Sequence, residues 1–437
     1  MELLKQGKVR DIFFSKSFQD HLIIYHSDRL SSFDSNICDI EGKGNLLMLL
    51  SIWWLENTKN IIDNHYVSHY RNYMLIKKCE VIPLEFIVRG YITGSTNTSL
   101  WTHYNNGSRN YCGVDFPDGL LKNQKLECPV LTPTTKSDEH DELISCEEIL
   151  KRKILFKDQL DFIKQKALEL FRFGQEVADK NGLILVDTKY EFGIDVNKNI
   201  LLIDEIHTGD SSRYWRKETY ADLFNEGKEP QKIDKDAVRD YIRSVCDPYK
   251  DKIPSPEEIP QTVKDNVVSG YKFLYENISG NTYTNQIVGN LIEHSHVNML
   301  LNSLVRRHIV IILAGSVRDS DHINKISSHL DKFNILHETC VCSAHKNTSE
   351  LLQLMKGYNS LKNIKIVFIT IAGRSNALSG VVACNTEYPV LACPPFKDKI
   401  DMFININSTL QCPSNTPVLA VLEPENVAIS CKRILSL

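Results

Sequence analysis

Short apolar runs predict a strand-rich unit at the start of the chain. Over residues 1–90, HLIIYHSD, YMLIKKCEVI and LEFIVRGYI are alternating or continuously apolar, as in half-buried or buried strands. One helix is predicted over residues 43–58, where GNLLMLLSIWWLEN interrupts these runs. Helical periodicity then appears over residues 145–182, 234–246 and 261–279. Strands and helices thus occur in separate runs, and the fold class we predict for this part is α+β.

Continuous apolar runs alternate with helical segments over residues 308–437. HIVIILAGS, ILHETCVCS and IKIVFITIAG predict buried strands, and SDHINKISSHLDKF and SELLQLMKGY predict the helices between them. YPVLACPP and PVLAVLEP predict two shorter strands. The alternation predicts an α/β fold, a Rossmann-like (flavodoxin-like) parallel sheet covered by helices on both faces. Polar clusters end three of the strands, at Gly315-Ser316, residues 343–346 and residues 373–376, where the ligands of such sheets bind.

The composition is that of an ordinary globular protein with more than one domain. The chain has 437 residues, and a single core rarely grows beyond ~250–300 residues. Polar and poorly periodic sequence after residue 279 predicts a linker over residues 281–306, between domains at 1–280 and 307–437. The net charge is −4 and no long basic block is present, which argues against a nucleic-acid partner.

No segment of the sequence predicts a membrane or secretory destination. The apolar runs fall short of the ~20 residues that a membrane-spanning helix needs. The first residues, MELLKQGKVRDIFF, lack the apolar core of a signal peptide. The 12 cysteines are scattered without a CxxC pair, which is usual for reduced core residues of an intracellular protein. We therefore expect a cytoplasmic protein with no membrane partner.

Residues 183–215 carry the strongest chemical signal. LILVDTKYEFGID and ILLIDEIHT predict the arms of a β-hairpin, over residues 183–195 and 200–208, with the turn VNKN between them. Acids gather on both arms and a basic residue follows: Asp187, Glu191, Asp195, Asp204, Glu205 and Arg213. Gathered carboxylates are unfavourable unless a cation neutralises them, and oxygen-only ligands suit Mg²⁺. From spacing alone, a solvated acidic hairpin explains the segment equally well.

Basic residues and small polar groups are dense in several other segments of the first unit. GKVRD places Lys8 and Arg10 at alternate positions after a glycine, which would suit nucleotide phosphates. RGYITGS offers an arginine, hydroxyls and glycines for a phosphate monoester, and DRLSSFD, LKNQ and TPTTKSDEHD are similarly polar. Capping and turn chemistry explains any one of these segments, but it explains the set poorly.

These segments resemble the motifs of a known family. GKVRDIF, DRLSSFD, EFIVRGYITGS, LTPTTKSDEHDE, DTKYEFGID and DEIHTGDSSRYW are similar, in order, to motifs of phosphoribosylaminoimidazole-succinocarboxamide synthase, over residues 1 to about 280. Members of that family are ligases of purine biosynthesis, which use ATP to join aspartate to carboxyaminoimidazole ribotide. The resemblance implies an ATP-grasp-like fold, ATP and Mg²⁺ as cofactors, and activation of the ribotide carboxylate as an acyl phosphate.

The resemblance also implies roles for single residues of the ligase. It implies ATP phosphate contacts from four basic side chains: Lys8, Arg10, Lys122 and Lys136. Mg²⁺ would be bound by Glu191 and Asp204. Arg89 and Ser95 would bind the 5′-phosphate of the ribotide, and Arg213, with Asp210 before it, would orient the ribotide and its carboxylate. Asp187 would lie close to the reacting groups, and Asp34 near the incoming aspartate.

Residues 308–437 resemble a second family, phosphoribosylaminoimidazole carboxylase. The similar motifs are GSVRD, SAHK, AGRSNALSG and ACPP, and the SAHK and AGRSN forms are those of the branch that uses CO₂ directly. The resemblance implies that His345 moves the C4 proton of aminoimidazole ribotide and that Ser343 helps to hold CO₂. It implies ribotide contacts from six further side chains: Ser316, Asp319, Lys346, Arg374, Ser375 and Asn376. One departure is Arg318, which stands where the phosphate loop GSxSD usually has a hydroxyl residue.

Three alternatives to a carboxylase fused to a ligase stay open at this stage. The second domain could be a mutase that rearranges an N-carboxy intermediate, or an inactive domain kept for assembly, which Arg318 would favour. Two domains serving as an anion-binding scaffold would leave Glu191, Asp204 and His345 without a role. Relatives of the carboxylase assemble as octamers, so the resemblance implies a homo-oligomer, with small molecules as the other partners.

Overall fold

The structure is a computed structural model. It describes residues 2–14, 19–33, 35–70, 72–96, 98–136, 142–233, 236–248, 250–283, 308–359, 361 and 364–436. Asp34, predicted to lie near the incoming aspartate, and residues 284–307, most of the predicted linker, are outside the described residues. The predicted domain boundaries at 280 and 307 therefore stay predictions.

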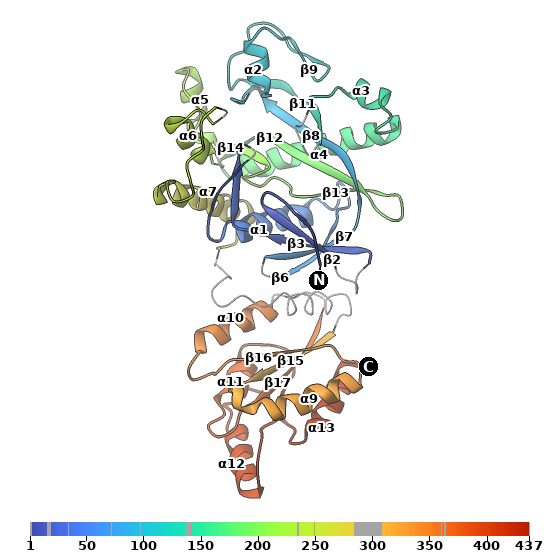
Figure 1. The fold of residues 1–437 in the computed structure, drawn as a ribbon, viewed down its shortest axis with the longest axis vertical. Helices are drawn as coiled ribbons and strands as arrows, with labels where there is room; N and C mark the ends of the chain where they lie inside the picture. Colours follow the sequence, from blue (N-terminus) through green and yellow to red (C-terminus); the bar gives the residue numbers. More distant parts are fainter. Residues whose placement is uncertain are drawn as a thin grey trace.

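The first unit begins with an antiparallel sheet, drawn in blue in Figure 1, in the order β1-β2-β3-β7-β6. Its strands are β1 (Glu2–Gln6), β2 (Arg10–Phe14), β3 (His21–His26), β6 (Tyr66–Tyr70) and β7 (Tyr73–Lys77). Helix α1 (Lys43–Asn57) confirms the predicted helix and contributes Met48 and Ile52 to a core with Ile24 and Met74 of this sheet. Two short strands, β4 (Arg29–Ser32) and β5 (Ser35–Asp39), precede α1.

A second antiparallel sheet forms the centre of this unit, with the order β11-β8-β12-β13. Its strands are β8 (Glu80–Tyr91), β11 (Lys125–Thr135), β12 (Leu183–Ile194) and β13 (Ile200–Ile203), and β14 (Ser212–Arg216) also pairs with β12. Helix α4 (Lys157–Lys180) packs on this sheet through buried residues such as Ile163 and Phe171. Strand β12 therefore has partners along both edges and is buried along most of its length.

The remaining elements of this unit surround the two sheets. They are α2 (Leu100–Asn105), β9 (Asn110–Tyr111), β10 (Val114–Asp115), α3 (Cys146–Lys151), α5 (Lys217–Asn225), α6 (Asp236–Val245) and α7 (Gln261–Ser279). Helices α6 and α7 confirm two predictions, and α7 packs against α1. The helix predicted over residues 145–182 is instead divided into α3 and α4, because Lys153 adopts a left-handed conformation, with φ of 56°, that a helix cannot continue.

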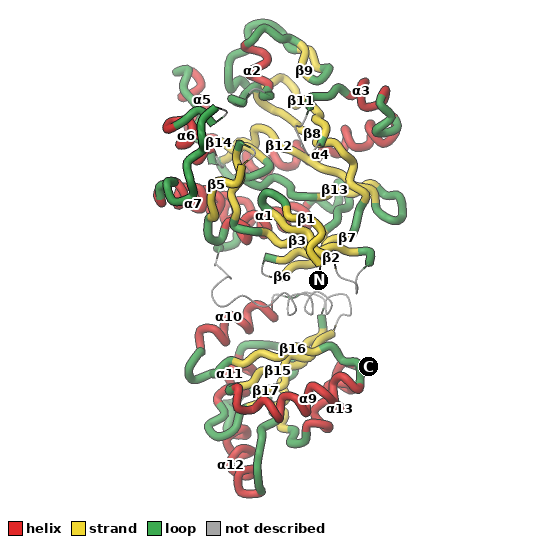
Figure 2. The backbone as a smooth tube through the Cα atoms, in the orientation of Figure 1, coloured by secondary structure: helices red, strands yellow, loops and turns green. Residues whose placement is uncertain are grey.

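The second unit is a five-stranded parallel sheet in the order β16-β15-β17-β18-β19 (Figures 1 and 2). Its strands are β15 (His308–Ala314), β16 (His337–Val341), β17 (Lys365–Ile371), β18 (Val390–Ala392) and β19 (Leu419–Ala420). Its helices are α9 (Ser320–Lys332), α10 (Thr348–Asn359), α11 (Ala377–Cys384), α12 (Lys399–Leu410) and α13 (Pro424–Leu435). Numbered along the chain, the strands have the order 2-1-3-4-5 of flavodoxin-like folds, which confirms the predicted class.

Alternate residues of the central strands supply two separate cores. Ile311 of β15 belongs to the core under α10 and α11, whereas Ile312 belongs to the core under α9 and α13. This arrangement explains why the strands are continuously apolar in sequence. Among the helices in the described part of the chain, none has both the length and the apolar character to cross a membrane.

Candidate active sites

The acids of the first unit lie on one strand and on the loop that follows its hairpin partner. Asp187 and Glu191 are both inside β12, four residues apart, in an uninterrupted stretch of pairing with β8. Asp187 is opposite Arg89 of β8 on one edge and opposite Arg213 of β14 on the other. The sheet thus places three residues predicted for the ribotide site next to one another.

Arginines enclose Asp187. Arg213 and Arg89 both donate to its Oδ2, Arg89 at 3.4 Å, and the Nε of Arg89 donates to the hydroxyl of Thr132 at 2.9 Å. The side chains of Arg89 and Asp187 are only 8% and 7% exposed, so Coulomb attraction between them is weakly screened. The pairing orients both charges before any substrate arrives.

Lysines neutralise Glu191 in the same way. Lys136 donates to one of its oxygens, and Lys189 donates to the other at 2.7 Å while also reaching Glu85 at 2.7 Å. The Glu191 side chain is 4% exposed, whereas that of Lys136 is 41% exposed at the edge of the cluster. Lys136, predicted as an ATP contact, therefore lies beside the predicted metal ligand.

The second hairpin arm is shorter than predicted. Pairing with β12 ends at Ile203, because Asp204 and His207 adopt left-handed conformations, with φ of 66° and 53°, which turn the chain away from the sheet. The ring of His207 is buried, with its Nε2 2.6 Å from the Tyr190 hydroxyl, and it makes a T-shaped contact with Trp54 at 4.5 Å between ring centroids. Residues 204–211 thus form an anchored loop rather than a strand, and strain of this kind is common at functional sites.

The loop turns its first two acids toward strand β2. Arg10 forms an ion pair with Asp204 at 2.6 Å and one with Glu205 at 3.2 Å. Burial alone would raise the pKa of the Asp204 carboxyl, but Arg10, Lys189 and Lys136 hold that pKa well below its usual value. Asp204 and Glu191 consequently share one network of basic neighbours.

This network fits a magnesium site that is completed by substrate. In the described part of the chain, no group of three or more His, Cys, Asp or Glu side chains could hold a metal by itself. Mg²⁺, however, is usually bound by one or two carboxylates together with substrate phosphates. Glu191 and Asp204 supply that donor set, and the basic groups around them suit phosphate oxygens.

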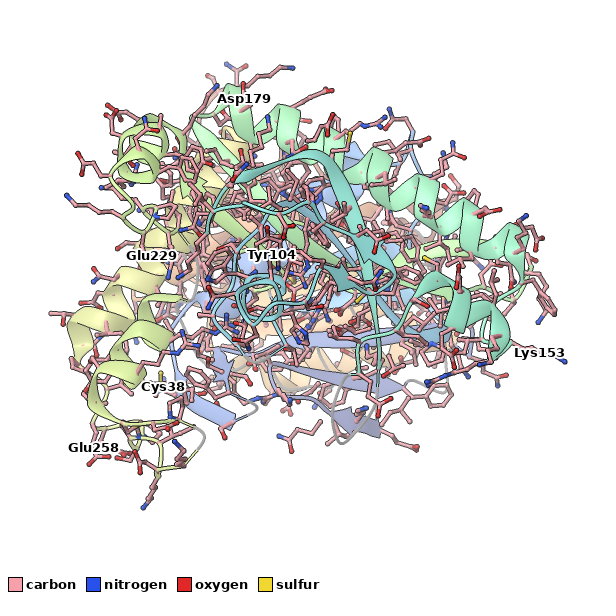
Figure 3. All side chains as sticks on the ribbon, turned by 90° about the horizontal axis from the view of Figure 1, so that it is seen from above. Cys38, Tyr104, Lys153, Asp179, Glu229 and Glu258 are labelled. Carbon is pink, nitrogen blue, oxygen red and sulfur yellow. The ribbon has the colours of Figure 1, made fainter. Side chains whose placement is uncertain are left out.

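A cavity of about 580 Å³ that includes Arg213 is lined by basic side chains. Ser95, Lys122 and Arg213, all singled out in the sequence, line it together with Arg239 and Arg243 of α6. Arg243 donates to the Ser95 hydroxyl at 2.8 Å, and Lys122 pairs with Glu229, which is labelled in Figure 3, at 2.5 Å. Lys122 was grouped with the ATP contacts, but the structure places it in this cavity with Ser95.

A second cavity of about 280 Å³ is lined by the acids and arginines of the sheet. Arg89, Asp187 and Asp210 contribute to it, and Arg213 and Arg239 line both cavities. The two cavities are therefore neighbours that share these two arginines, and Lys189 of the smaller cavity pairs with Glu191. Lys8 lies away from both, exposed in the turn before β2, where its carbonyl accepts from Arg29 at 3.2 Å.

Sequence reasoning missed several side chains of these cavities. The two cavities add Lys189, Lys232, Arg239 and Arg243, and a small third cavity beside Arg10 adds Lys43. Arg239 and Arg243 are four residues apart on a predicted helix, so one face of that helix is basic, and this was a readable signal. Lys189 also precedes Glu191 by two, on the same face of the strand. Nothing in the sequence singled out Lys43.

The second unit gathers its predicted residues at the carboxyl ends of three adjacent strands. After β15, the Ser316 hydroxyl accepts from the amide of Arg318 at 3.1 Å, and burial raises the pKa of Asp319. After β16, the Ser343 hydroxyl accepts from the amide of Lys346 at 3.3 Å, and the His345 side chain is exposed. The parallel order β16-β15-β17 brings these two loops and the loop after β17 to one edge of the sheet.

The loop after β17 divides its predicted residues between surface and interior. Arg374 is 72% exposed and 3.4 Å from Asp401, and Ser375 adopts a left-handed conformation. Asn376 is buried, caps α11 by accepting from the amide of Ser379 at 3.1 Å, and donates to Thr409 at 2.9 Å. These bonds give Asn376 a structural role, so its contact with ribotide stays a prediction. The Arg318 side chain is exposed.

Comparison with known proteins identifies both units. Residues 3–256, more than half of the chain, match the family model for SAICAR synthetase. The chain belongs to the SAICAR synthetase family. Residues 309–437 match the family model for AIR carboxylase. The protein is therefore a SAICAR synthetase fused to an AIR carboxylase domain, a bifunctional enzyme of purine biosynthesis, as the two resemblances in the sequence implied.

Relatives of this SAICAR synthetase include proteins of plants, bacteria and yeast. The chloroplastic phosphoribosylaminoimidazole-succinocarboxamide synthase of Arabidopsis thaliana is 50% identical over 276 residues, which are 63% of this chain and 66% of that protein. The enzyme of Legionella pneumophila (strain Paris) is 48% identical over 64% of this chain and 88% of its own length. The solved SAICAR synthase of Saccharomyces cerevisiae, complexed with SAICAR, is 30% identical, with a TM-score of 0.55 over 64% of this chain and 96% of that one.

Proposed function

We propose that the second domain carboxylates aminoimidazole ribotide with CO₂ and that the first domain ligates the product to L-aspartate with ATP. The observation that carries this proposal is a pair of neighbouring cavities: the larger is lined by basic side chains, and the smaller is lined by Lys189, which pairs with Glu191. A ribotide has its phosphate and its reacting carboxylate at opposite ends, and this arrangement suits both ends at once. The yeast relative was solved with SAICAR bound, which supports the same substrate class.

The phosphate end of the ribotide is assigned to the larger cavity. Ser95 and Arg243 already form a hydrogen bond there, and Arg213 and Arg239 extend the positive charge toward the sheet. Arginines bind phosphate oxygens through two parallel donors, which fixes the orientation of the group as well as its position. Arg89 is better placed to orient the far end of the ribotide, since it lines the smaller cavity beside Asp187.

In the ligase reaction, a ribotide carboxylate oxygen attacks the γ-phosphorus of ATP. A new P–O bond forms, the bond to the β-phosphate oxygen breaks, and ADP leaves. The amine of aspartate then attacks the carbonyl carbon, so that a C–N bond forms, the C–O bond to phosphate breaks and the amine releases its proton. Arg10, Lys136 and Lys189 would neutralise charge on the transferring group. Held by Glu191 and Asp204, Mg²⁺ would supply further positive charge to the phosphate oxygens.

In the carboxylase reaction, C4 of the aminoimidazole attacks CO₂ and a proton leaves C4. The ring is an enamine, so C4 is nucleophilic and neither ATP nor biotin is needed. His345, at the carboxyl end of β16, would accept the proton, and Ser343 would contact CO₂. Ser316 and Asp319 after β15, with Arg374 and Ser375 after β17, border the point where the strand order reverses, and this is where such folds bind ligands.

Assembly through the carboxylase domain is part of the same proposal. Helix α12 exposes large apolar side chains, with Ile400 75%, Phe403 68% and Leu410 62% exposed. An exposed apolar face on a helix is typical of a subunit contact. We therefore expect a homo-oligomer, with an octamer as the predicted size.

One assay tests the proposed sequence of reactions. Purified full-length protein receives aminoimidazole ribotide, bicarbonate, Mg²⁺, aspartate and ATP, and formation of succinyl-aminoimidazole-carboxamide ribotide is followed. Without ATP, carboxyaminoimidazole ribotide should accumulate. If the ribotide is carboxylated only when it is supplied as the N-carboxy intermediate, the second domain is a mutase; no carboxylation from either precursor would identify an assembly domain.

A further inference from the structure

Lys43 is a buried lysine that the reaction described above does not use. It is the first residue of α1 and its side chain is 1% exposed. Its Nζ donates to Oδ2 of Asp210 at 2.8 Å, and the Asp210 side chain is itself 6% exposed. Burying two charges is unfavourable unless their geometry is good and their remaining polar atoms are bonded, so such a pair calls for a reason.

The second oxygen of Asp210 is bonded as well. The hydroxyl of Tyr271, from α7, donates to Oδ1. The chain before Asp210 lies directly on the same ring, because a Cβ at Gly209 would be 2.5 Å from Cε1 of Tyr271. Helices α1 and α7, which pack against each other, therefore hold Asp210 from two sides.

The start of α1 is also fixed in position. Gly42 and Gly44 donate their amides to the two carboxylate oxygens of Asp28, at 3.1 and 2.9 Å. A side chain at Gly44 would collide with the carbonyls of His26 and Ser27, so only glycine allows this approach of helix to strand. Lys43 thus projects toward Asp210 from a helix end that these contacts hold in place.

Asp210 lies in the wall between the two halves of the ligase site. It lines the 280 Å³ cavity and also a small cavity that contains Arg10 and Glu205. The other charged or titratable side chains that line these two cavities are His26, Lys43, Arg89, Asp187, Lys189, Arg213 and Arg239. Because Asp210 lines the larger of these cavities together with Arg89 and Asp187, a change in the direction or charge of its carboxylate would act at the ribotide end.

We propose that Lys43 and Tyr271 are positioning residues of the ligase, which hold Asp210 ionised and aimed at the bound ribotide. Neither side chain needs to contact substrate; each acts through one oxygen of Asp210. The inference rests on the ligase reaction proposed above. If the unchanged enzyme forms no SAICAR in the same assay, the proposed ligase reaction is wrong. If it forms SAICAR, the variants below test this inference by itself.

The test compares Lys43→Met, Lys43→Arg and Tyr271→Phe in the full-length protein, with Lys164→Met, an exposed lysine on α4, as the matched control. Misplacement of a reacting group by ~1 Å lowers rates roughly 10²-fold, so Lys43→Met should lose about that much in kcat while KM for ATP stays within about twofold. Tyr271→Phe should lose less, and Lys43→Arg should recover part of the rate. The control should match the unchanged enzyme.

The pH profile separates positioning from a purely structural role. Without Lys43, the buried carboxylate of Asp210 loses its cation and its pKa should rise, so activity of Lys43→Met should increase with pH across the neutral range. Asp210→Asn should be slow at every pH. Unchanged kcat in Tyr271→Phe, or a slow Lys43→Met whose pH profile matches that of the unchanged enzyme, would overturn the inference. Should Lys43→Met fail to fold, Tyr271→Phe and the degree of recovery in Lys43→Arg decide the question.

Discussion

At the scale of single residues, the carboxylates of the ligase site already have basic partners. Arg213 and Arg89 bind Asp187, Lys136 and Lys189 bind Glu191, and Arg10 binds Asp204. When substrate binds, a metal ion would therefore replace basic side chains as the partner of these carboxylates. The released lysines and arginines would then bind the substrate phosphates.

Glu191→Gln tests whether the Glu191 carboxylate binds the metal ion. The substitution keeps the size of the side chain but removes the negative charge that would bind Mg²⁺, so ligase turnover should nearly disappear. Thermal unfolding should change less than turnover, because the amide oxygen can still accept from one of the two lysines, and Lys189 keeps its pairing with Glu85. Glu176→Gln, at an exposed position of α4, is the control. Near-normal turnover in Glu191→Gln would remove this residue from the metal site.

Buried histidines should make the first unit sensitive to acid. Burial lowers the pKa of His207 to about 3 and that of His65 to about 4, against about 6.5 in the unfolded chain. Below about pH 6.5 the unfolded state binds more protons, so stability should fall as the pH falls, and each of these histidines should lower the free energy of unfolding by about 2 kcal/mol between pH 7 and pH 5.

Tryptophan fluorescence can follow that loss in the first unit alone. All four tryptophans, at positions 53, 54, 101 and 215, belong to it. Urea unfolding at pH 7 and at pH 5 gives the difference in free energy. A midpoint that does not move between these two pH values would contradict the assignment of neutral, buried rings.

At the scale of elements, helices and buried strands were predictable, whereas the loop with the acids was not. The run ILLIDEIHT begins with the apolar residues of a strand and gives no local sign of where the strand ends, but His207 packs against Trp54 and Tyr190, and these tertiary contacts impose the turn at Asp204. Motif spacing identified the acids of β12. It could not identify Lys43, because that contact depends on how distant helices pack.

Helix α6 contacts two polar segments that lie far apart in the sequence, DRLSSFD and RGYITGS. Arg239 donates to Ser32 of the first segment at 3.1 Å, and Arg243 donates to Ser95 of the second at 2.8 Å.

Arg243→Ala should raise KM for carboxyaminoimidazole ribotide by about 10- to 100-fold, the loss expected for a hydrogen bond to a charged group, with a smaller change in kcat. Arg172→Ala, exposed on α4, is the control. An unchanged KM would exclude Arg243 from binding the ribotide phosphate.

At the scale of the whole molecule, the two proposed reactions belong to two domains that have different folds. Asp187, Glu191, Arg89 and Arg213 of the ligase lie on an antiparallel sheet, and the predicted carboxylase residues lie at the edge of a parallel one. The product proposed for the second domain is the substrate proposed for the first, so each half can be assayed by itself with the right ribotide.

His345→Asn should separate the two activities. The variant should lose carboxylation of aminoimidazole ribotide, because asparagine cannot accept the C4 proton, and should keep ligation when carboxyaminoimidazole ribotide is supplied. His345 is exposed after β16, so the substitution should leave stability unchanged. Loss of both activities at once would contradict the assignment of separate sites.

Strand β12 also fixes the spacing between Asp187, predicted to lie beside the reacting groups, and Glu191, the predicted metal ligand. From Asp187 to Glu191 its pairing with β8 is regular, and the irregularities fall outside this interval. Four residues of extended chain span roughly 13 Å. Inserting or deleting one residue here would send one of the two carboxylates to the opposite face of the sheet. Natural variation in length should therefore be tolerated in the turn at residues 196–199 and be excluded from the four-residue interval.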